Sequence, residues 1–94
     1  MPMDNEKDNY EGLREKLNNN EVWPLRYMFK FIVPNADGKV DLVKSYLPKE
    51  GKISFKHTAS LKFVSITCLV NMNSADEIIE ITKKANAVAG VITL

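Results

Sequence analysis

The chain has 94 residues, of which 45% are hydrophobic and 27% are charged, and its formal net charge is +1. A chain of this length forms one domain that buries roughly 60–70% of the surface its unfolded form exposes. The near-neutral charge lacks the strong basic bias that is typical of proteins that bind nucleic acids or membrane surfaces. We therefore expect one globular domain that binds neither.

Cysteine usage and the N-terminus indicate the compartment. Cys68 is the only cysteine, so the chain forms no intramolecular disulfide, and a reducing compartment is favoured. Residues 1–6 are polar and acidic, whereas a signal peptide begins basic and then becomes apolar. No apolar run approaches the roughly 20 residues that span a bilayer. The sequence predicts a cytoplasmic protein.

Residues 1–20 form a polar leader ahead of the domain predicted over residues 22–94. Tyr10, Leu13 and Leu17 recur at helical spacing and favour a short helix around them. Three apolar side chains make a narrow stripe, and such a helix is marginal on its own in water. Two interpretations stay open: the leader is disordered, or it is a short, displaceable helix that lies over the sheet.

The first half of the domain predicts a strand followed by a helix. Residues 27–33 are rich in aromatic and β-branched side chains and only seven long, which favours a strand. A cluster of turn residues follows. A helix then carries Val40, Val43 and Leu47 at spacings of three and four, and Pro48 ends it.

The second half predicts two strands, a helix and a last strand. Residues 53–58 and 61–70 are the strands, and the second of them alternates apolar and polar side chains. Ser74 and Glu77 form a capping box, in which each side chain satisfies a free backbone N–H at the start of the helix. Residues 91–94 form the last strand.

This order, βαββαβ, predicts an α+β two-layer sandwich with both helices on one face of an antiparallel sheet. We expect the sheet order 4-1-3-2. The two most hydrophobic strands, 1 and 3, are then central. The more polar strand 2 and the short strand 4 are then edges, which limits edge-to-edge pairing between molecules.

Four blocks of the sequence carry a resemblance to a known family: residues 27–34, 62–67, 74–80 and 90–94. In order and spacing they resemble the YbeD-like family of small bacterial proteins of unknown function, over about residues 22–94. The resemblance implies a ferredoxin-like fold similar to ACT regulatory domains, which sense small molecules or mediate pairing, and it implies no reaction. One departure is Leu61, where the family has a glycine before a lysine-aromatic pair.

The residues that usually carry catalysis or metal binding are isolated in this sequence. His57 is the only histidine, and one histidine without a second ligand makes no metal or catalytic site. Cys68 lies within an apolar strand face, where an inert buried thiol is expected. Asp76 and Glu77 are explained by helix capping. We therefore expect no enzyme activity, no cofactor and no metal.

RNA-recognition domains share the predicted strand order and stack bases on aromatic residues of strands 1 and 3. Phe63 occupies one such position, but Ser65 stands two residues further along, and the glycine of that signature is missing. Together with the net charge, this pattern predicts no binding of nucleic acid.

The helices of a two-layer sandwich cover one face of the sheet, so the other face carries the candidate interaction residues. These are Met28, Lys30, Ile32, Phe63, Ser65, Thr67 and Leu69. The set is more apolar than a fully hydrated face, and contiguous apolar patches mark contacts. We expect a non-enzymatic regulatory or adaptor module that contacts a protein partner, or a second copy of itself, through this face. Lys30 is expected to be solvated.

A second hypothesis is an ACT-like sensor of a small anionic metabolite. It places the ligand at Asn35, Asp37 and Gly38, where backbone N–H groups at a helix N-terminus favour anions. Asp37 opposes this hypothesis because it is negative and suits the N-cap position.

Overall fold

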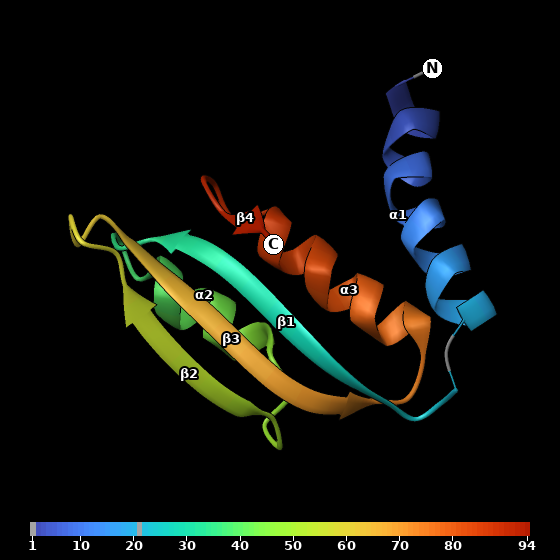
Figure 1. The fold of residues 1–94 in the computed structure, drawn as a ribbon. Coiled ribbons are helices and arrows are strands. Elements are labelled where there is room, and N and C mark those ends of the chain that lie inside the picture. The colour runs from blue at the N-terminus through green and yellow to red at the C-terminus, as the bar shows by residue number, and fades with distance from the viewer. Residues whose placement is uncertain (1, 21) are drawn as a thin grey trace.

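The structure is a computed structural model that describes residues 2–20 and 22–94. Its elements, in chain order, are α1 (Pro2–Asn20), β1 (Leu25–Pro34), α2 (Lys39–Tyr46), β2 (Lys52–His57), β3 (Phe63–Met72), α3 (Ala75–Asn86) and β4 (Ile92–Thr93) (Figure 1). The predicted strands and helices occur in the predicted order. Because α1 precedes β1, the whole chain is not strictly βαββαβ.

The four strands form one antiparallel sheet in the order β2-β3-β1-β4, which is the predicted order 4-1-3-2 counted from the other edge. The central strands β1 and β3 have ten residues each and pair along their whole length. The start predicted for β3, at Leu61, was two residues too early. Leu61 has a φ of 60° and belongs to the turn before the strand, where its N–H donates to the Thr58 carbonyl at 2.9 Å.

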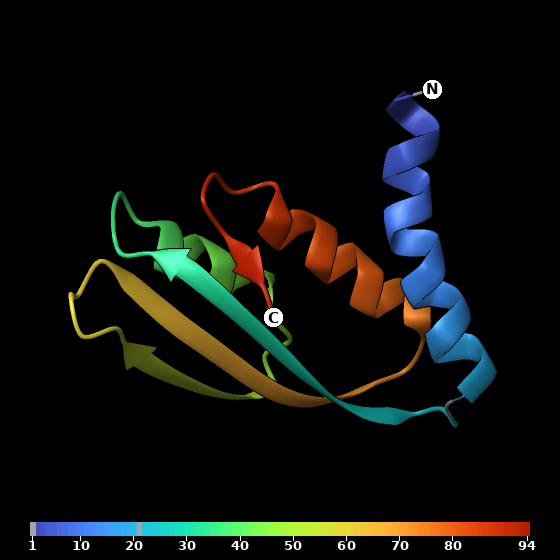
Figure 2. The ribbon, with the colours of Figure 1, turned by 45° about the horizontal axis from the view of Figure 1, so that its top comes forward.

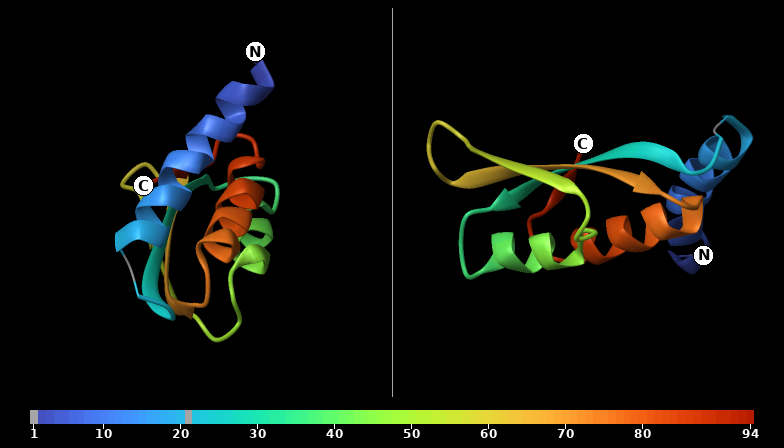
Figure 3. Two further views of the ribbon diagram at one scale, coloured as in Figure 1. Left: turned by 90° about the vertical axis from the view of Figure 1, so that its right-hand side faces the viewer. Right: turned by 90° about the horizontal axis from the view of Figure 1, so that it is seen from below.

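Helices α2 and α3 cover one face of the sheet, so the domain has two layers (Figures 2 and 3). The hydrophobic core lies between these layers. Its largest fully buried side chains are Phe31, Val33, Val43, Ile66, Cys68, Ile78 and Ile79. They come from β1, β3, α2 and α3, and their burial fixes which face of each strand points away from solvent.

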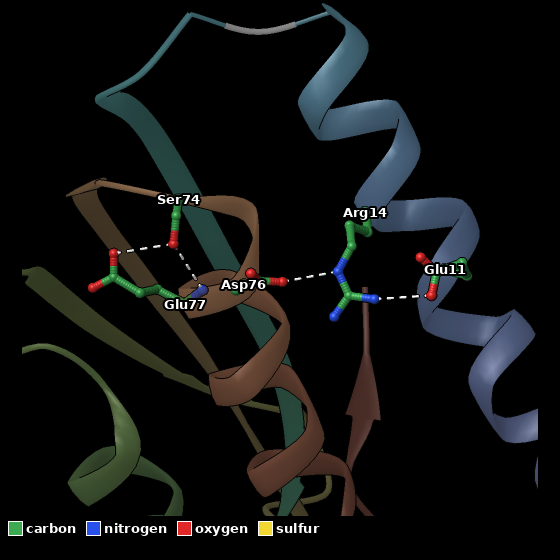
Figure 4. A network of polar contacts seen from close by, with 5 residues as sticks. All are labelled: Glu11, Arg14, Ser74, Asp76 and Glu77. Atoms are coloured by element: carbon green, nitrogen blue, oxygen red, sulfur yellow. Dashed lines mark hydrogen bonds and ion pairs between the residues drawn. The ribbon is translucent and has the colours of Figure 1, made fainter.

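Helix α3 begins at the predicted cap. The Ser74 Oγ accepts a hydrogen bond from the Glu77 backbone N–H at 3.2 Å, as one half of a capping box requires. The Glu77 carboxylate accepts from the Ser74 hydroxyl at 3.3 Å (Figure 4). The predicted serine cap is confirmed, whereas the Glu77 carboxylate, predicted to accept from a backbone N–H, accepts from the Ser74 hydroxyl.

Helix α1 packs against α3, at one end of the sheet (Figure 3). Leu17 is only 8% exposed and belongs to the hydrophobic core, and Leu13 packs beside it. Arg14 donates from Nε to Asp76 at 2.8 Å and from Nη1 to Glu11 at 2.9 Å (Figure 4). The leader is a helix that lies beside α3 and not over the open side of the sheet, because its leucines contact the core there.

None of the helices in the described part of the chain combines the length and apolar character that crossing a bilayer requires.

Candidate functional site

The sheet face opposite α2 and α3 is called the open face here, and it carries the seven residues predicted for it. The antiparallel register sets Met28 opposite Leu69, Lys30 opposite Thr67, and Ile32 opposite Ser65, with Phe63 at the end opposite Pro34. Successive side chains of a strand alternate between faces, so these cross-strand pairs share one side. The structure therefore brings together every residue that the sequence assigned to this surface.

The side chains of the open face differ in their exposure. Met28 is 52% exposed and Lys30 is also exposed. The other five are half-buried, because neighbours on adjacent strands cover their flanks rather than their tips. No element among residues 2–20 and 22–94 lies over this face (Figure 3). An apolar patch with this exposure is available to a partner.

Seven further residues lie on the open face that the sequence reasoning did not assign to it: Arg26, Pro34, Lys52, Ser54, Lys56, Asn71 and Ile92. The register sets Lys52 opposite Leu69, Ser54 opposite Thr67, and Lys56 opposite Ser65. On the other side, Ile92 stands opposite Ile32 and is 54% exposed. The signal that finds these residues is the same alternation, applied to both edge strands and to the full length of β1 and β3.

The candidate ligand loop lines an open hollow of about 650 Å³ between α2 and β2. Asn35, Asp37 and Gly38 all contribute to this hollow, together with Phe55 and His57 from the strand. The hollow is on the helix side of the sheet, so it is separate from the open face. The structure thus presents two distinct surfaces for binding.

The loop that leads into α2 has a tight backbone rather than a side-chain cap. Asp37 and Gly38 both have positive φ, at 54° and 72°, and Gly38 is the N-cap residue without a side-chain hydrogen bond. The expectation that Asp37 caps the helix was therefore wrong, because the chain turns through two left-handed residues before the helix begins. Asn35 is structural, since its Nδ2 donates to the Leu61 carbonyl at 3.1 Å.

The charged side chains around the hollow are partly engaged by the fold. Lys39 donates from Nζ to the Ala89 carbonyl at 3.1 Å. The Lys44 ammonium lies 5.8 Å from the centre of the Phe55 ring, which is within cation–π range. His57 is exposed at the rim. The ammonium groups of Lys39 and Lys44 are therefore only partly available to a ligand, because each already has a contact within the fold.

Cys68 is a core residue. Its side chain is fully buried on the covered face of β3, where Gly51 lies against it. Burial raises the pKa of the Cys68 thiol, and the Glu50 carboxylate raises it further. A thiol in such surroundings stays protonated at neutral pH and is a weak nucleophile. The groups of His, Cys, Asp and Glu in the described residues form no cluster of three that fits a metal ion.

Comparison with known proteins returned no match to a family, to a curated protein or to a solved structure.

Proposed function

We propose that this chain is a non-enzymatic regulatory or adaptor module that acts by protein–protein contact through the open face. The observation that carries the proposal is a sheet surface on which Met28 and Ile92 are about half exposed and which the described helices leave uncovered. Exposed apolar residues in a contiguous patch mark interaction sites. The lysine ammonium groups and the serine and threonine hydroxyls beside them can form ion pairs and hydrogen bonds with a partner.

The proposal includes a finer assignment of the fold and the setting. The four sequence blocks that resemble the YbeD-like family lie in β1, at the start of β3, in α3 and around β4, so they include parts of three of the four strands and one covering helix. We assign the domain to the ferredoxin-like, ACT-like folds on that basis. The single cysteine favours a reducing compartment such as the cytoplasm, and the family resemblance favours a bacterial protein.

Site-specific photo-crosslinking tests the contact. A photoreactive benzoylphenylalanine replaces Met28 on the open face, and in a matched variant it replaces Leu42 on α2. These two side chains are 52% and 44% exposed, so their access to solvent is similar. Illumination of cells that make each variant is expected to give discrete adducts of higher mass from position 28 and none from position 42.

Thermal melts of both purified variants serve as the control for folding. Adducts of equal yield at both positions, or no adduct from position 28, contradict a contact through the open face. A single adduct whose mass is twice that of the chain identifies a second copy as the partner.

A second candidate function is that of a sensor for a small anionic metabolite, and the hollow beside α2 favours it. Three residues assigned to a ligand from the sequence, Asn35, Asp37 and Gly38, line that hollow with Lys39 and Lys44. Backbone N–H groups at a helix start and nearby ammonium groups attract anions. A thermal-shift screen with amino acids, nucleotides and organic acids tests it, because a ligand of the folded state raises the melting temperature. No shift across the screen refutes the sensor function.

A further inference from the structure

All the lysines and arginines of the strands lie on the open face. They are Arg26, Lys30, Lys52 and Lys56, and each occupies a position whose side chain points away from α2 and α3. The strand residues include no aspartate or glutamate. Four of the six acidic residues of residues 22–94 lie on α2 and α3, and the other two, Asp37 and Glu50, lie in loops. The strand residues of the open face therefore carry positive charge alone, whereas α2 and α3 carry both lysines and acidic residues.

The strand register gives the spacing of these cations. Lys30 shares a row with Thr67 and Ser54, and Ser54 lies midway between Lys52 and Lys56 on β2. With strands about 4.8 Å apart and a rise of about 3.3 Å per residue, the Lys30 Cα is about 12 Å from those of Lys52 and Lys56, which are about 13 Å from each other. This spacing exceeds the Debye length of about 8 Å at physiological salt, so their mutual repulsion is largely screened. Each ammonium can thus bind a separate anion.

These cations have no counterion within the part of the chain that the structure describes. All four side chains are exposed, and the ion pairs and side-chain hydrogen bonds among the described residues involve none of them. Hydroxyl groups of Ser54, Ser65 and Thr67 stand between them. The surface therefore combines unpaired ammonium groups, hydroxyl donors and half-exposed apolar side chains.

We propose that the open face binds an acidic, amphipathic protein segment, in which carboxylates alternate with apolar residues. This inference rests on the proposed function and names its partner class. The carboxylates pair with the four cations, and the apolar residues cover Met28 and Ile92. A protein segment is favoured over single-stranded nucleic acid because Phe63 is the only aromatic residue among the open-face strand positions, and base stacking needs several such platforms.

Fluorescence anisotropy with the full chain tests this partner class. The probe is a short fluorescein-labelled peptide in which glutamate alternates with leucine and serine. The same peptide with lysine in place of glutamate, and a labelled oligothymidine, are the comparison probes. We expect the acidic peptide alone to bind, and its affinity to fall as the salt rises from about 50 to about 500 mM, because ion pairing at a surface is screened.

Charge-reversal variants locate the binding. Lys30→Glu and Lys56→Glu are each expected to weaken binding of the acidic peptide about fivefold, and Lys30→Gln about twofold, as exposed ion pairs contribute modestly. The matched control is Lys84→Glu on α3, an exposed residue of the opposite layer. It changes the net charge equally and is expected to leave the affinity unchanged.

Three outcomes overturn the inference. In the first, Lys84→Glu weakens binding as much as Lys30→Glu does, so that net charge alone accounts for the attraction. In the second, oligothymidine binds more tightly than the acidic peptide, which assigns the face to nucleic acid. In the third, the acidic peptide does not bind. If position 28 still crosslinks a protein in any of these cases, the proposed function stands and only the acidic partner class fails.

Discussion

Replacing Gly51 by alanine is expected to destabilise the fold through one close contact. A Cβ atom at this position would lie 2.5 Å from the Cys68 Sγ, 3.1 Å from the Pro48 carbonyl oxygen and 3.3 Å from the Val70 Cβ. Cys68 is fully buried, so its sulfur cannot move aside into solvent. Overpacking of this kind costs about 1–3 kcal/mol. The reduced entropy of the unfolded chain offsets about 0.4–1 kcal/mol, which leaves a net loss of at most about 2.6 kcal/mol and of about 1 kcal/mol at the middle of the range.

For a domain of this size, a loss of about 1 kcal/mol lowers the melting temperature by about 4–8 °C. Urea denaturation followed by circular dichroism measures the free energy of unfolding directly. The double variant with Cys68→Ala removes the sulfur, so the alanine methyl at Gly51 costs less there than in the parent chain. The expected coupling energy is about 1 kcal/mol. Strictly additive effects, or a more stable Gly51→Ala variant, refute the close contact between these two residues.

Three other predictions concern the hairpin, the leader and pH. Leu61→Gly is expected to stabilise the fold by about 1 kcal/mol in urea denaturation, because Leu61 is 63% exposed and has a left-handed φ of 60°. Deleting residues 1–20 is expected to leave a cooperatively melting domain that has lost about 2 kcal/mol from the burial of Leu17. Burial raises the pKa values of Tyr27 and Cys68 in the folded chain, so both groups lose their protons at a lower pH when the chain is unfolded. The free energy of unfolding is therefore at its full value below the ordinary thiol pKa of 9.0 and decreases as the pH rises above it. This decrease is expected to be smaller in the Tyr27→Phe, Cys68→Ala double variant, as urea denaturation across this pH range measures.

The sheet order was predictable because hydrophobicity differs so strongly between strands. Residues 27–33 and 64–70 are the most hydrophobic strand segments, and their alternate side chains are buried. Such strands favour the centre of the sheet, where each has a neighbouring strand on both sides. The cap of α3 was predictable for a local reason, since Ser74 and Glu77 are three residues apart. Both patterns act within one element or between neighbouring strands, and the sequence displays them directly.

The wrong predictions concern positions whose structure is set by an unusual backbone conformation or by a contact between residues far apart in the sequence. Leu61 and Asp37 both adopt left-handed φ, which residues other than glycine rarely do, so hydrophobic or capping preference gave the wrong placement. The docking of α1 depends on Leu17 meeting the core beside α3, which is a tertiary contact that helical spacing alone cannot locate. The seven open-face residues were found because strand alternation needs no such contact.

The cations of the open face show why the net charge of the chain does not describe the charge of one surface. Residues 22–94 contain ten lysines and arginines and six aspartates and glutamates, while residues 1–21, with six acidic and three basic residues, bring the whole chain to +1. The net charge of the whole chain says nothing about how the charged side chains are divided between the two faces of the sheet. Strand alternation does show this division, because Lys52 and Lys56 are four residues apart and must share a side, and the register adds Lys30 to that side. Under the proposed function, the charge that a partner meets is that of the open face, whose strand residues include four cations and no carboxylate.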